Sequence, residues 1–163
     1  MPQTAQTQVH PIPPLFDANS RVLILGSFPS VKSRAAMFFY GHPQNRFWRI
    51  MAALTNRPVP QSVEEKTDLI LSNHFALWDS IGSCTITGSS DSSIRDVVPN
   101  DLRVIVDHAP IERIFCNGAT SHKYYRRYNE PVLGRPAGIL PSSSPANAAW
   151  TLEKLIDAWR VIL

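Results

Sequence analysis

The sequence predicts a single α/β domain in which helices cover both faces of a mostly parallel sheet. Two observations lead to this fold class. A chain of 163 residues, 44% of them apolar, is long enough for one compact core but not for two. Short aliphatic and aromatic runs, typical of buried strands, alternate with segments of helical periodicity. Such alternation produces parallel strands joined by helical crossovers.

The first predicted strand follows a region of different composition. Residues 1–20 are rich in Pro, Gln and Thr, so we expect a flexible N-terminal arm there and the domain proper over residues 21–163. Residues 22–25 form a continuous aliphatic run that stops at Gly26. Such a run is typical of a strand buried on both faces of a parallel sheet.

Two helices are predicted next. Apolar residues at helical spacing predict a helix over residues 45–54. A second helix is predicted over residues 62–72, with Ser62 as its N-cap and Glu65 as the capping-box partner.

The second half of the chain continues the alternation. Residues 75–78 and 111–116 are predicted strands, and a polar loop is expected at residues 88–93. Apolar pairs within residues 132–140 frame a fourth extended piece. A last amphipathic helix is predicted over residues 146–163.

The polar loops follow the predicted strands. They begin after Leu25, Trp78, Cys116 and Leu140. In open α/β sheets, ligands bind at the carboxyl ends of the strands. We therefore expect a binding site at this edge of the sheet.

Amino-acid composition limits the possible fold classes more than it limits the possible functions. Sixteen Lys and Arg against 13 Asp and Glu give a net charge of +3, which suits a nucleic-acid-binding protein but is common elsewhere. Cys84, Cys116 and the five His residues show neither metal-ligand spacing nor a disulfide framework, so no metal is expected. There is no export signal and no long apolar run, so we expect a cytoplasmic protein without a membrane span.

Five short motifs occur in order along the chain, each at a predicted strand end or helix start. They are GSFPS at 26–30, YGHPQNRFW at 40–48, GSSDSSI at 88–94, FCNG at 115–118 and LPSSSPANA at 140–148. Together they resemble the uracil DNA glycosylase superfamily, most closely its hypoxanthine DNA glycosylase branch. The resemblance covers residues 21–163.

The resemblance implies a three-layer α/β/α sandwich with a central four-stranded, mostly parallel sheet. It also implies a monofunctional DNA glycosylase of base-excision repair, without a cofactor, that extrudes a deaminated base and hydrolyses its N-glycosidic bond. Hypoxanthine is the expected base and uracil is a further one. Double-stranded DNA containing such a base is the expected partner, single-stranded DNA is left open as another, and a monomer is expected.

The attacking water needs a residue to direct it. In several relatives an Asn or Asp in the first loop has this role, but residues 27–30 of this chain are Ser, Phe, Pro and Ser. In the hypoxanthine branch the critical residue is the Asn before the Phe-Trp pair, which corresponds to Asn45. Its carbonyl oxygen can hold a water, and charge stabilisation matters more here than a strong nucleophile. Alternatively, Asn45 only caps its helix.

The base must be stacked and read by hydrogen bonds. Asp79, directly after the second strand, is expected to accept the N–H of hypoxanthine or uracil, unless it only caps a turn. Phe39, Tyr40 or Phe28 would stack on the base, unless these rings fill the core. His42 and the amides of the first loop would donate hydrogen bonds. The expected base-binding residues are Gly26, Ser27, Phe28, Tyr40, His42 and Asp79.

The Ser-rich run near the C-terminus is expected to contact DNA. Its serines would bind phosphates, and Pro145 or Ala146 would fill the gap left by the extruded base, unless the run is only a turn. Lys123, Arg126 and Arg127 could add phosphate contacts. The expected DNA-binding residues are Ser30, Lys32, Ser142, Ser143, Ser144, Pro145, Ala146 and Asn147.

Two other functions stay open from sequence. One is a DNA-binding module of the same fold with weak or no catalysis. The other is a hydrolase or transferase acting on free nucleosides.

Overall fold

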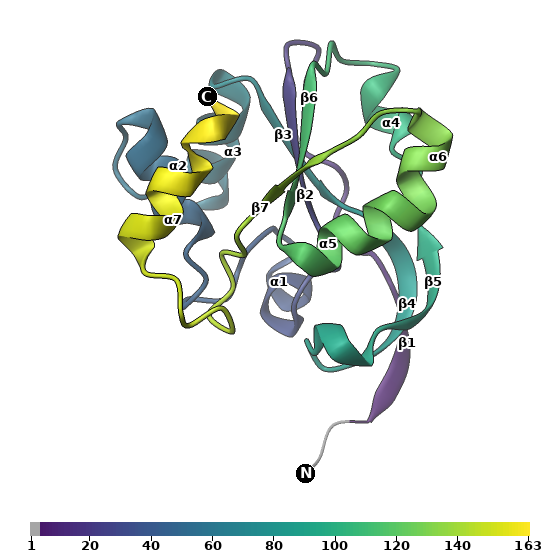
Figure 1. Ribbon diagram of the computed structural model, residues 1–163. Coiled ribbons are helices and arrows are strands. Elements are labelled where there is room, and N and C mark those ends of the chain that lie inside the picture. The colour runs from purple at the N-terminus through teal and green to yellow at the C-terminus, as the bar shows by residue number, and fades with distance from the viewer. Residues whose placement is uncertain (1–3) are drawn as a thin grey trace.

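A four-stranded parallel sheet forms the centre of the molecule. The computed structural model describes residues 4–163, so residues 1–3 of the expected arm lie outside the described part. The strand order is β3–β2–β6–β7, and all neighbours are parallel (Figure 1). The strands are β2 (Val22–Gly26), β3 (Phe75–Asp79), β6 (Arg113–Asn117) and β7 (Gly138–Leu140). The expected sheet is confirmed.

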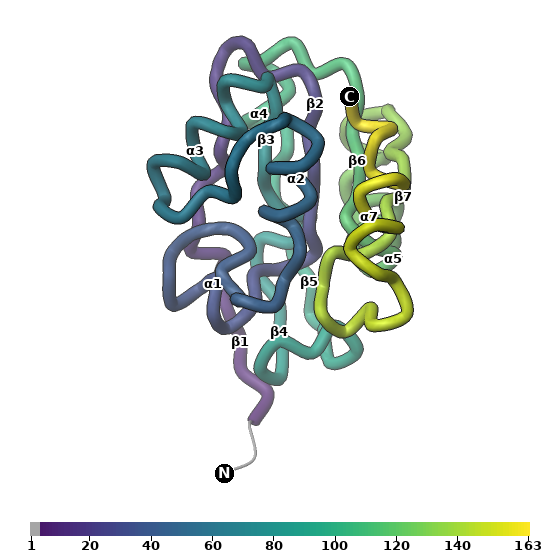
Figure 2. The backbone as a smooth tube through the Cα atoms, turned by 90° about the vertical axis from the view of Figure 1, so that its left-hand side faces the viewer, coloured from purple at the N-terminus to yellow at the C-terminus, as the bar shows by residue number. Residues whose placement is uncertain are grey.

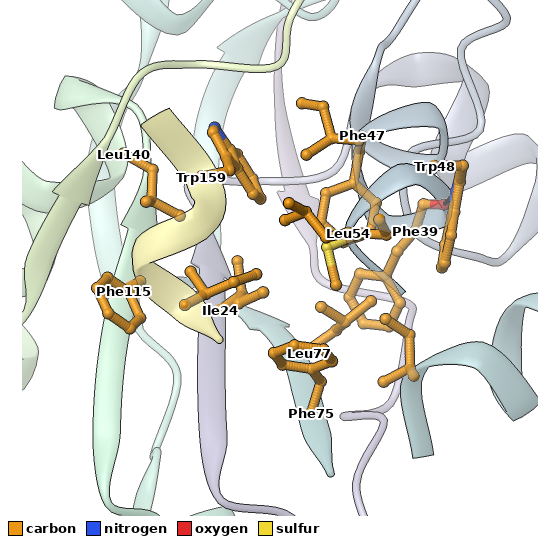
Figure 3. Close-up of a cluster of buried hydrophobic side chains, with 14 of the residues drawn as sticks. Ile24, Phe39, Phe47, Trp48, Leu54, Phe75, Leu77, Phe115, Leu140 and Trp159 are labelled. Atoms are coloured by element: carbon orange, nitrogen blue, oxygen red, sulfur yellow. Dashed lines mark hydrogen bonds between the residues drawn. The ribbon is translucent and has the colours of Figure 1, made fainter. Parts of the chain in front are cut away.

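Three helices cover one face of this sheet (Figures 1 and 2). Ile24 of β2 faces them and packs in a large apolar cluster with Phe47 and Trp159 (Figure 3). As predicted, Ser62 caps the second helix, its Oγ accepting the Glu65 N–H at 3.1 Å. The helices are α2 (Phe47–Thr55), α3 (Val63–Ser72) and α7 (Leu152–Trp159).

The other face carries the third layer. Leu23 and Leu25 alternate with Ile24 along β2 and pack against Ile105 and Tyr125. This alternation buries β2 on both faces and confirms the three-layer α/β/α arrangement. The covering elements are α4 (Arg103–Val106), α5 (Ala119–Tyr124), the π-helical turn η2 (Tyr125–Asn129) and α6 (Glu130–Leu133).

A second, antiparallel sheet was not predicted. Its order is β1–β4–β5, and β4 begins directly after Ser80, which follows β3. Along β4 the pattern of burial is nearly alternating, as expected for a strand with one covered face. The turn η1 (Asp91–Ser93) connects β4 to β5. The strands are β1 (Ala5–Val9), β4 (Ile81–Thr87) and β5 (Arg95–Pro99).

Residues 4–20 are part of the folded domain, which corrects the expected flexible arm. β1 pairs with β4 from Ala5 opposite Thr87 to Val9 opposite Ser83. Ile12 is 2% exposed and belongs to the main apolar cluster. Backbone pairing and this one apolar anchor hold a segment whose composition by itself suggests disorder.

Element boundaries near the C-terminus also differ from the prediction. Residues 132 and 133, part of the expected fourth extended piece, belong instead to α6 (Glu130–Leu133), which has Pro131 in its first turn and is followed by Gly134 with φ 67°. The last helix begins at Leu152, because the Thr151 hydroxyl caps it by accepting the Lys154 N–H. A short helix α1 (Val31–Ala36) was not predicted.

Candidate active site

A cavity of about 470 Å³ opens at the carboxyl ends of the parallel strands. This volume lies within the range of small-molecule sites. Gly26, Asp79 and Asn117 end three neighbouring strands and line it, as expected for a ligand site in an open α/β sheet.

Most of the residues predicted from sequence meet in this one cavity. Lys32 and Asn147 do not line it, and Lys32 is exposed on α1. The predicted residues that line the cavity are Gly26, Ser27, Phe28, Ser30, Tyr40, His42, Asn45, Asp79, Ser142, Ser143, Ser144, Pro145 and Ala146.

The Asp79 carboxylate lies over Gly26. Gly26 pairs with Asp79 in the sheet register, and a Cβ at Gly26 would stand 2.3 Å from Asp79 Oδ1. Any side chain at position 26 would therefore displace the Asp79 carboxylate. The same Cβ position is 3.4 Å from the Tyr40 hydroxyl, so this hydroxyl and Oδ1 both approach Gly26.

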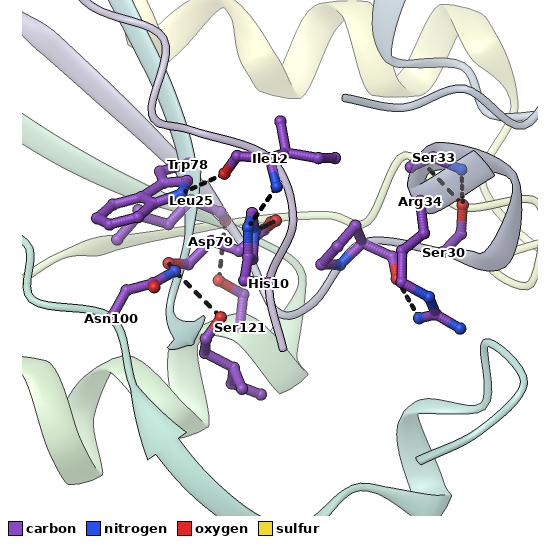
Figure 4. Close-up of polar contacts among 12 residues, drawn as sticks. His10, Ile12, Leu25, Ser30, Ser33, Arg34, Trp78, Asp79, Asn100 and Ser121 are labelled. Carbon is purple, nitrogen blue, oxygen red and sulfur yellow. Dashed lines mark hydrogen bonds and ion pairs between the residues drawn. The ribbon is translucent and has the colours of Figure 1, made fainter. Parts of the chain in front are cut away.

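Asp79 is buried and bound by a residue that the sequence did not indicate. Its Oδ2 is 2.6 Å from Nε2 of His10, which follows β1 (Figure 4). No local pattern marks His10 as a site residue, because it reaches Asp79 only through the pairing of β1 with β4.

Asn45 is fixed through its side-chain oxygen. Oδ1 accepts the Phe47 N–H at 2.9 Å and the Ser143 Oγ–H at 2.8 Å. The N-cap residue of α2 is Arg46, so Asn45 is not the N-cap considered from sequence; its oxygen instead closes a turn onto the first N–H of the helix. Because a backbone N–H can only donate, the atom facing Phe47 must be the oxygen. The water-holding role expected for that oxygen does not fit this arrangement, since both of its lone pairs are used.

Ser143 joins Asn45 to the end of β6. The Asn117 amide donates to Ser143 Oγ at 2.9 Å, and the Ser143 N–H donates to Asn117 Oδ1 at 3.0 Å. Ser143 is 1% exposed. Its hydroxyl is thus internal, which corrects the expected phosphate contact. Gly118, with φ 96°, allows the close approach, because a Cβ there would lie 3.1 Å from that of Ser142.

Arg46 holds the loop that forms one wall of the cavity. Its guanidinium donates to the carbonyls of Ser144 at 2.7 Å and Asn147 at 3.0 Å, and also to those of Ser143 and Trp150. One planar donor fork therefore ties a loop without regular secondary structure to the start of α2.

Ser30 and Asn147 each make a side-chain hydrogen bond that stabilises a local segment. Ser30 Oγ accepts the Ser33 N–H and caps α1. The Asn147 amide donates to the Ser142 carbonyl at 3.0 Å. The Ser30 hydroxyl is thus engaged within the protein, and so is one N–H of the Asn147 amide.

Asp91 is a second carboxylate in the cavity. It comes from the 88–94 motif, and Ser27 Oγ donates to its Oδ1 at 3.2 Å. The residue as a whole is exposed, but the protein surrounds its carboxyl group. This desolvation raises the pKa of Asp91 above its usual range, with a smaller contribution from the negative charge of Asp79. The sequence did not predict Asp91 as a site residue, because it lies in a polar loop after a strand, β4, that was itself not predicted.

Tyr40 presents a buried hydroxyl. Its ring stacks on Phe47 with centroids 4.0 Å apart, so one ring face is covered. Within residues 4–163, the hydroxyl has no hydrogen-bond partner of good geometry, although Asn117 lies near it. Burial raises the pKa of Tyr40, and the Asp79 charge adds to this effect, so the O–H stays a donor.

Phe28 and His42 complete the wall. The Arg34 guanidinium lies 5.6 Å from the centre of the Phe28 ring, and the His10 ring meets Phe28 edge-on at 5.8 Å. His42 Nδ1 accepts the Gln44 N–H at 3.1 Å, so the neutral ring carries its proton on Nε2.

The two thiols are poor nucleophiles. Burial raises the pKa of Cys84 to about 11 and that of Cys116 to about 12. In the part of the chain that the structure describes, His, Cys, Asp and Glu form no cluster of three or more suited to a metal ion. Over the same residues, no helix combines the length and the apolar character needed to cross a bilayer.

A basic groove begins near the cavity. Lys123, Arg126 and Arg127 are exposed and line it together with His122. These residues belong to α5 and η2, and α5 starts beside Gly118, which approaches Ser142.

Known proteins share both the sequence and the fold. The family model "Uracil DNA glycosylase superfamily" matches residues 13–162. A hypoxanthine DNA glycosylase of Methanosarcina acetivorans is 36% identical over 87% of this chain and 90% of its own length. One of Methanosarcina barkeri is 34% identical over 83% and 85%.

A solved structure agrees. The solution NMR structure of a Methanosarcina acetivorans protein, provisionally described as a uracil DNA glycosylase, superposes with a TM-score of 0.77 at 28% identity and 99% coverage of both chains. With a family match over almost the whole chain, relatives above 30% identity and the same fold, the chain belongs to the uracil DNA glycosylase superfamily.

Proposed function

We propose that this protein is a monofunctional DNA glycosylase that releases hypoxanthine from deoxyinosine in DNA, with uracil as a further base. One observation carries the proposal: an acceptor, Asp79 Oδ1, and a partnerless donor, the Tyr40 O–H, approach the same point at Gly26. The pairing edges of hypoxanthine and uracil carry an N–H beside a carbonyl, which complements this pair. The names of the two Methanosarcina relatives support the choice of base.

The chemistry follows from the remaining groups. Base release places negative charge on the departing base and positive charge on the sugar. Asn45 acts through its amide N–H groups, because its oxygen is held by Phe47 and Ser143. These donors stabilise the departing base.

The attacking water needs an acceptor for its proton. Asp91 is the other carboxylate lining the cavity, and its raised pKa makes it a stronger base than an ordinary aspartate. It takes the place of the first-loop Asn or Asp that this chain lacks.

The substrate is a base extruded from duplex DNA. Phosphates bind in the groove of Lys123, Arg126 and Arg127. The proposal includes a role in base-excision repair. We also propose that the protein acts as a monomer, which sedimentation of the DNA complex would test. Its proposed location is the cytoplasm, which fractionation of cells would test.

Single-turnover base release tests the proposal. Duplexes containing deoxyinosine, deoxyuridine or normal bases are incubated with excess protein, and abasic sites are cleaved with alkali. We expect release of hypoxanthine, slower release of uracil and none of normal bases. Free deoxyinosine serves as a separate substrate. DNA binding without release from any duplex would contradict the proposal, and so would cleavage of the free nucleoside alone.

Asp79→Asn tests the reading of the base. His10 donates to the Asp79 side chain, so the new amide must turn its oxygen to His10 and its NH₂ to the base. The NH₂ group of the new amide and the N–H of the base, which are both donors, then face each other. We expect hypoxanthine release to fall about 10-fold or more, since an unpaired buried donor costs about 1 to 3 kcal/mol. An unchanged rate would show that Asp79 does not read the base.

A further inference from the structure

The contact that holds Asp79 comes from the N-terminal segment. His10 Nε2 and Asp79 Oδ2 are 2.6 Å apart, and the two side chains are 3% and 6% exposed (Figure 4). Within residues 4–163, this is the one hydrogen bond to the Asp79 carboxylate. A buried carboxylate depends on such a donor to keep its charge.

The tautomer of His10 follows from its second nitrogen. Nδ1 accepts the Ile12 N–H at 3.2 Å. A backbone N–H can only donate, so Nδ1 carries no proton and the ring proton is on Nε2. The ring therefore donates to Asp79 Oδ2, and Oδ1 is left as the acceptor beside Gly26.

The ring is also fixed mechanically. It meets Phe28 and Trp78 edge-on, with centroids 5.8 Å and 6.0 Å away. The Trp78 indole N–H donates to the Ile12 carbonyl at 3.0 Å, and the His10 N–H donates to the Gly82 carbonyl at 2.7 Å. The backbone on both sides of the ring is thus tied to β3 and β4.

We propose that His10 is a positioning residue for base selection, whose Nε2–H keeps Asp79 an ionised acceptor turned toward the base. The inference rests on the proposed function, because Asp79 is taken as the base reader. Two other titratable groups face Asp79. The Tyr40 hydroxyl is neutral, and the negative charge of Asp91 opposes that of Asp79. Neither can replace His10.

The consequence is a dependence on pH. Without the donor, the buried Asp79 carboxylate takes up a proton more readily. A protonated carboxyl group donates instead of accepting, so it no longer pairs with the N–H of hypoxanthine. The acid limb of the rate profile must then move to higher pH.

Two variants separate positioning from a merely structural role. His10→Leu removes the donor and keeps the bulk, whereas His10→Gln can place a side-chain N–H near the position of Nε2. For His10→Leu we expect single-turnover hypoxanthine release to be lost more steeply toward acid pH than in the wild type, so that the ratio of the two rates falls as the pH falls. His10→Gln should restore much of the wild-type profile. His108→Leu, which changes an exposed histidine, is the matched control. Equal losses at every pH in both His10 variants would overturn the proposal.

A measurement on the resting protein tests the pair without catalysis. Long-range ¹H–¹⁵N correlation of the histidine rings in the wild type should show the His10 ring with its proton on Nε2 and none on Nδ1. An Nδ1–H tautomer, or a doubly protonated ring, would overturn the inference even if His10→Leu fails to fold. If the wild type releases no base but His10 has the expected tautomer, the proposed function fails and the His10–Asp79 contact stands.

Discussion

Asn45 and Asp79 share a feature at the scale of single residues: each has one polar atom fixed by the protein and one left toward the cavity. Asn45 Oδ1 is held by Phe47 and Ser143, which leaves the amide nitrogen. Asp79 Oδ2 is held by His10, which leaves Oδ1. The chemistry that each residue can offer depends on the remaining atom rather than on the residue type alone.

Two substitutions of Asn45 separate the role of its side-chain oxygen from that of its amide N–H groups. Asn45→Asp keeps an oxygen for the Phe47 N–H and the Ser143 hydroxyl but replaces the NH₂ by a second oxygen. We expect hypoxanthine release to fall at least ~100-fold in both Asn45→Ala and Asn45→Asp, because each loses a donor needed at the transition state. Only Asn45→Ala should also lose about 1 kcal/mol of stability, because the Phe47 N–H and the Ser143 hydroxyl lose their shared acceptor. Single-turnover rates and thermal unfolding measure the two effects, and full activity in Asn45→Asp would exclude the donors.

In the wild type, where His10 holds Asp79, Asp91 is one residue whose ionisation should limit the rate in acid. A base must be deprotonated to act, and the pKa of Asp91 is raised by desolvation. The rate should therefore fall, as pH decreases, at a higher pH than for an ordinary aspartate. We expect Asp91→Asn to lower base release about 100-fold or more and to remove this ionisation from the profile. Unchanged rates at all pH values would leave Asp91 with a structural role only.

At the scale of elements, the loop from Ser142 to Trp150 has two parts. Ser143 is internal, and Arg46 binds the loop carbonyls. Pro145 and Ala146 line the cavity from the outer part, where Ala146 is exposed. The inner part orients Asn45, and the outer part is free to meet DNA.

Replacement of Pro145 and Ala146 tests whether this outer part of the loop acts as a wedge, that is, whether it fills the gap left by the extruded base. We expect the Pro145→Gly, Ala146→Gly double variant to lose activity on a paired deoxyinosine about 10-fold more than on a single-stranded one. A paired base must be extruded at a cost of a few kcal/mol, and the wedge lowers that cost. The neighbouring Ala148→Gly, Ala149→Gly variant, at exposed positions that do not line the cavity, is the control. Equal losses on both substrates would reject the wedge.

At the scale of the whole molecule, separate segments meet at one edge of the parallel sheet. The N-terminal segment supplies His10, the 88–94 loop supplies Asp91, and the 142–146 loop supplies Ser143. The basic groove of α5 and η2 starts beside this edge and concentrates positive charge on one surface of a protein whose net charge is only +3.

Salt dependence tests that surface. We expect Lys123→Ala and Arg126→Ala to weaken binding of all DNA sequences alike and to reduce the slope of log K against log salt by about one each. Arg21→Ala is the control, because Arg21 precedes β2 and so lies at the opposite, amino end of the sheet. A slope unchanged in both groove variants would place the phosphates elsewhere. Fluorescence anisotropy over a salt series measures it.

The sequence by itself determined the parallel sheet, its helices and the edge that carries the cavity. These features depend on local patterns: the aliphatic run of β2, the helical spacing of α2 and the capping box of α3. Motifs at strand ends meet at one edge of a parallel sheet, so their gathering in one cavity could be foreseen.

Only the tertiary structure decided which atoms are free and which distant segments take part. β1 forms by pairing with β4, so local composition predicts neither this strand nor the contact between His10 and Asp79. The internal place of Ser143 likewise depends on Asn45 and Asn117, which are far from it in sequence. Local sequence patterns indicate secondary-structure propensity and which face of a helix or strand is buried. Hydrogen bonds between residues far apart in the chain depend on how those faces pack, which no local pattern records.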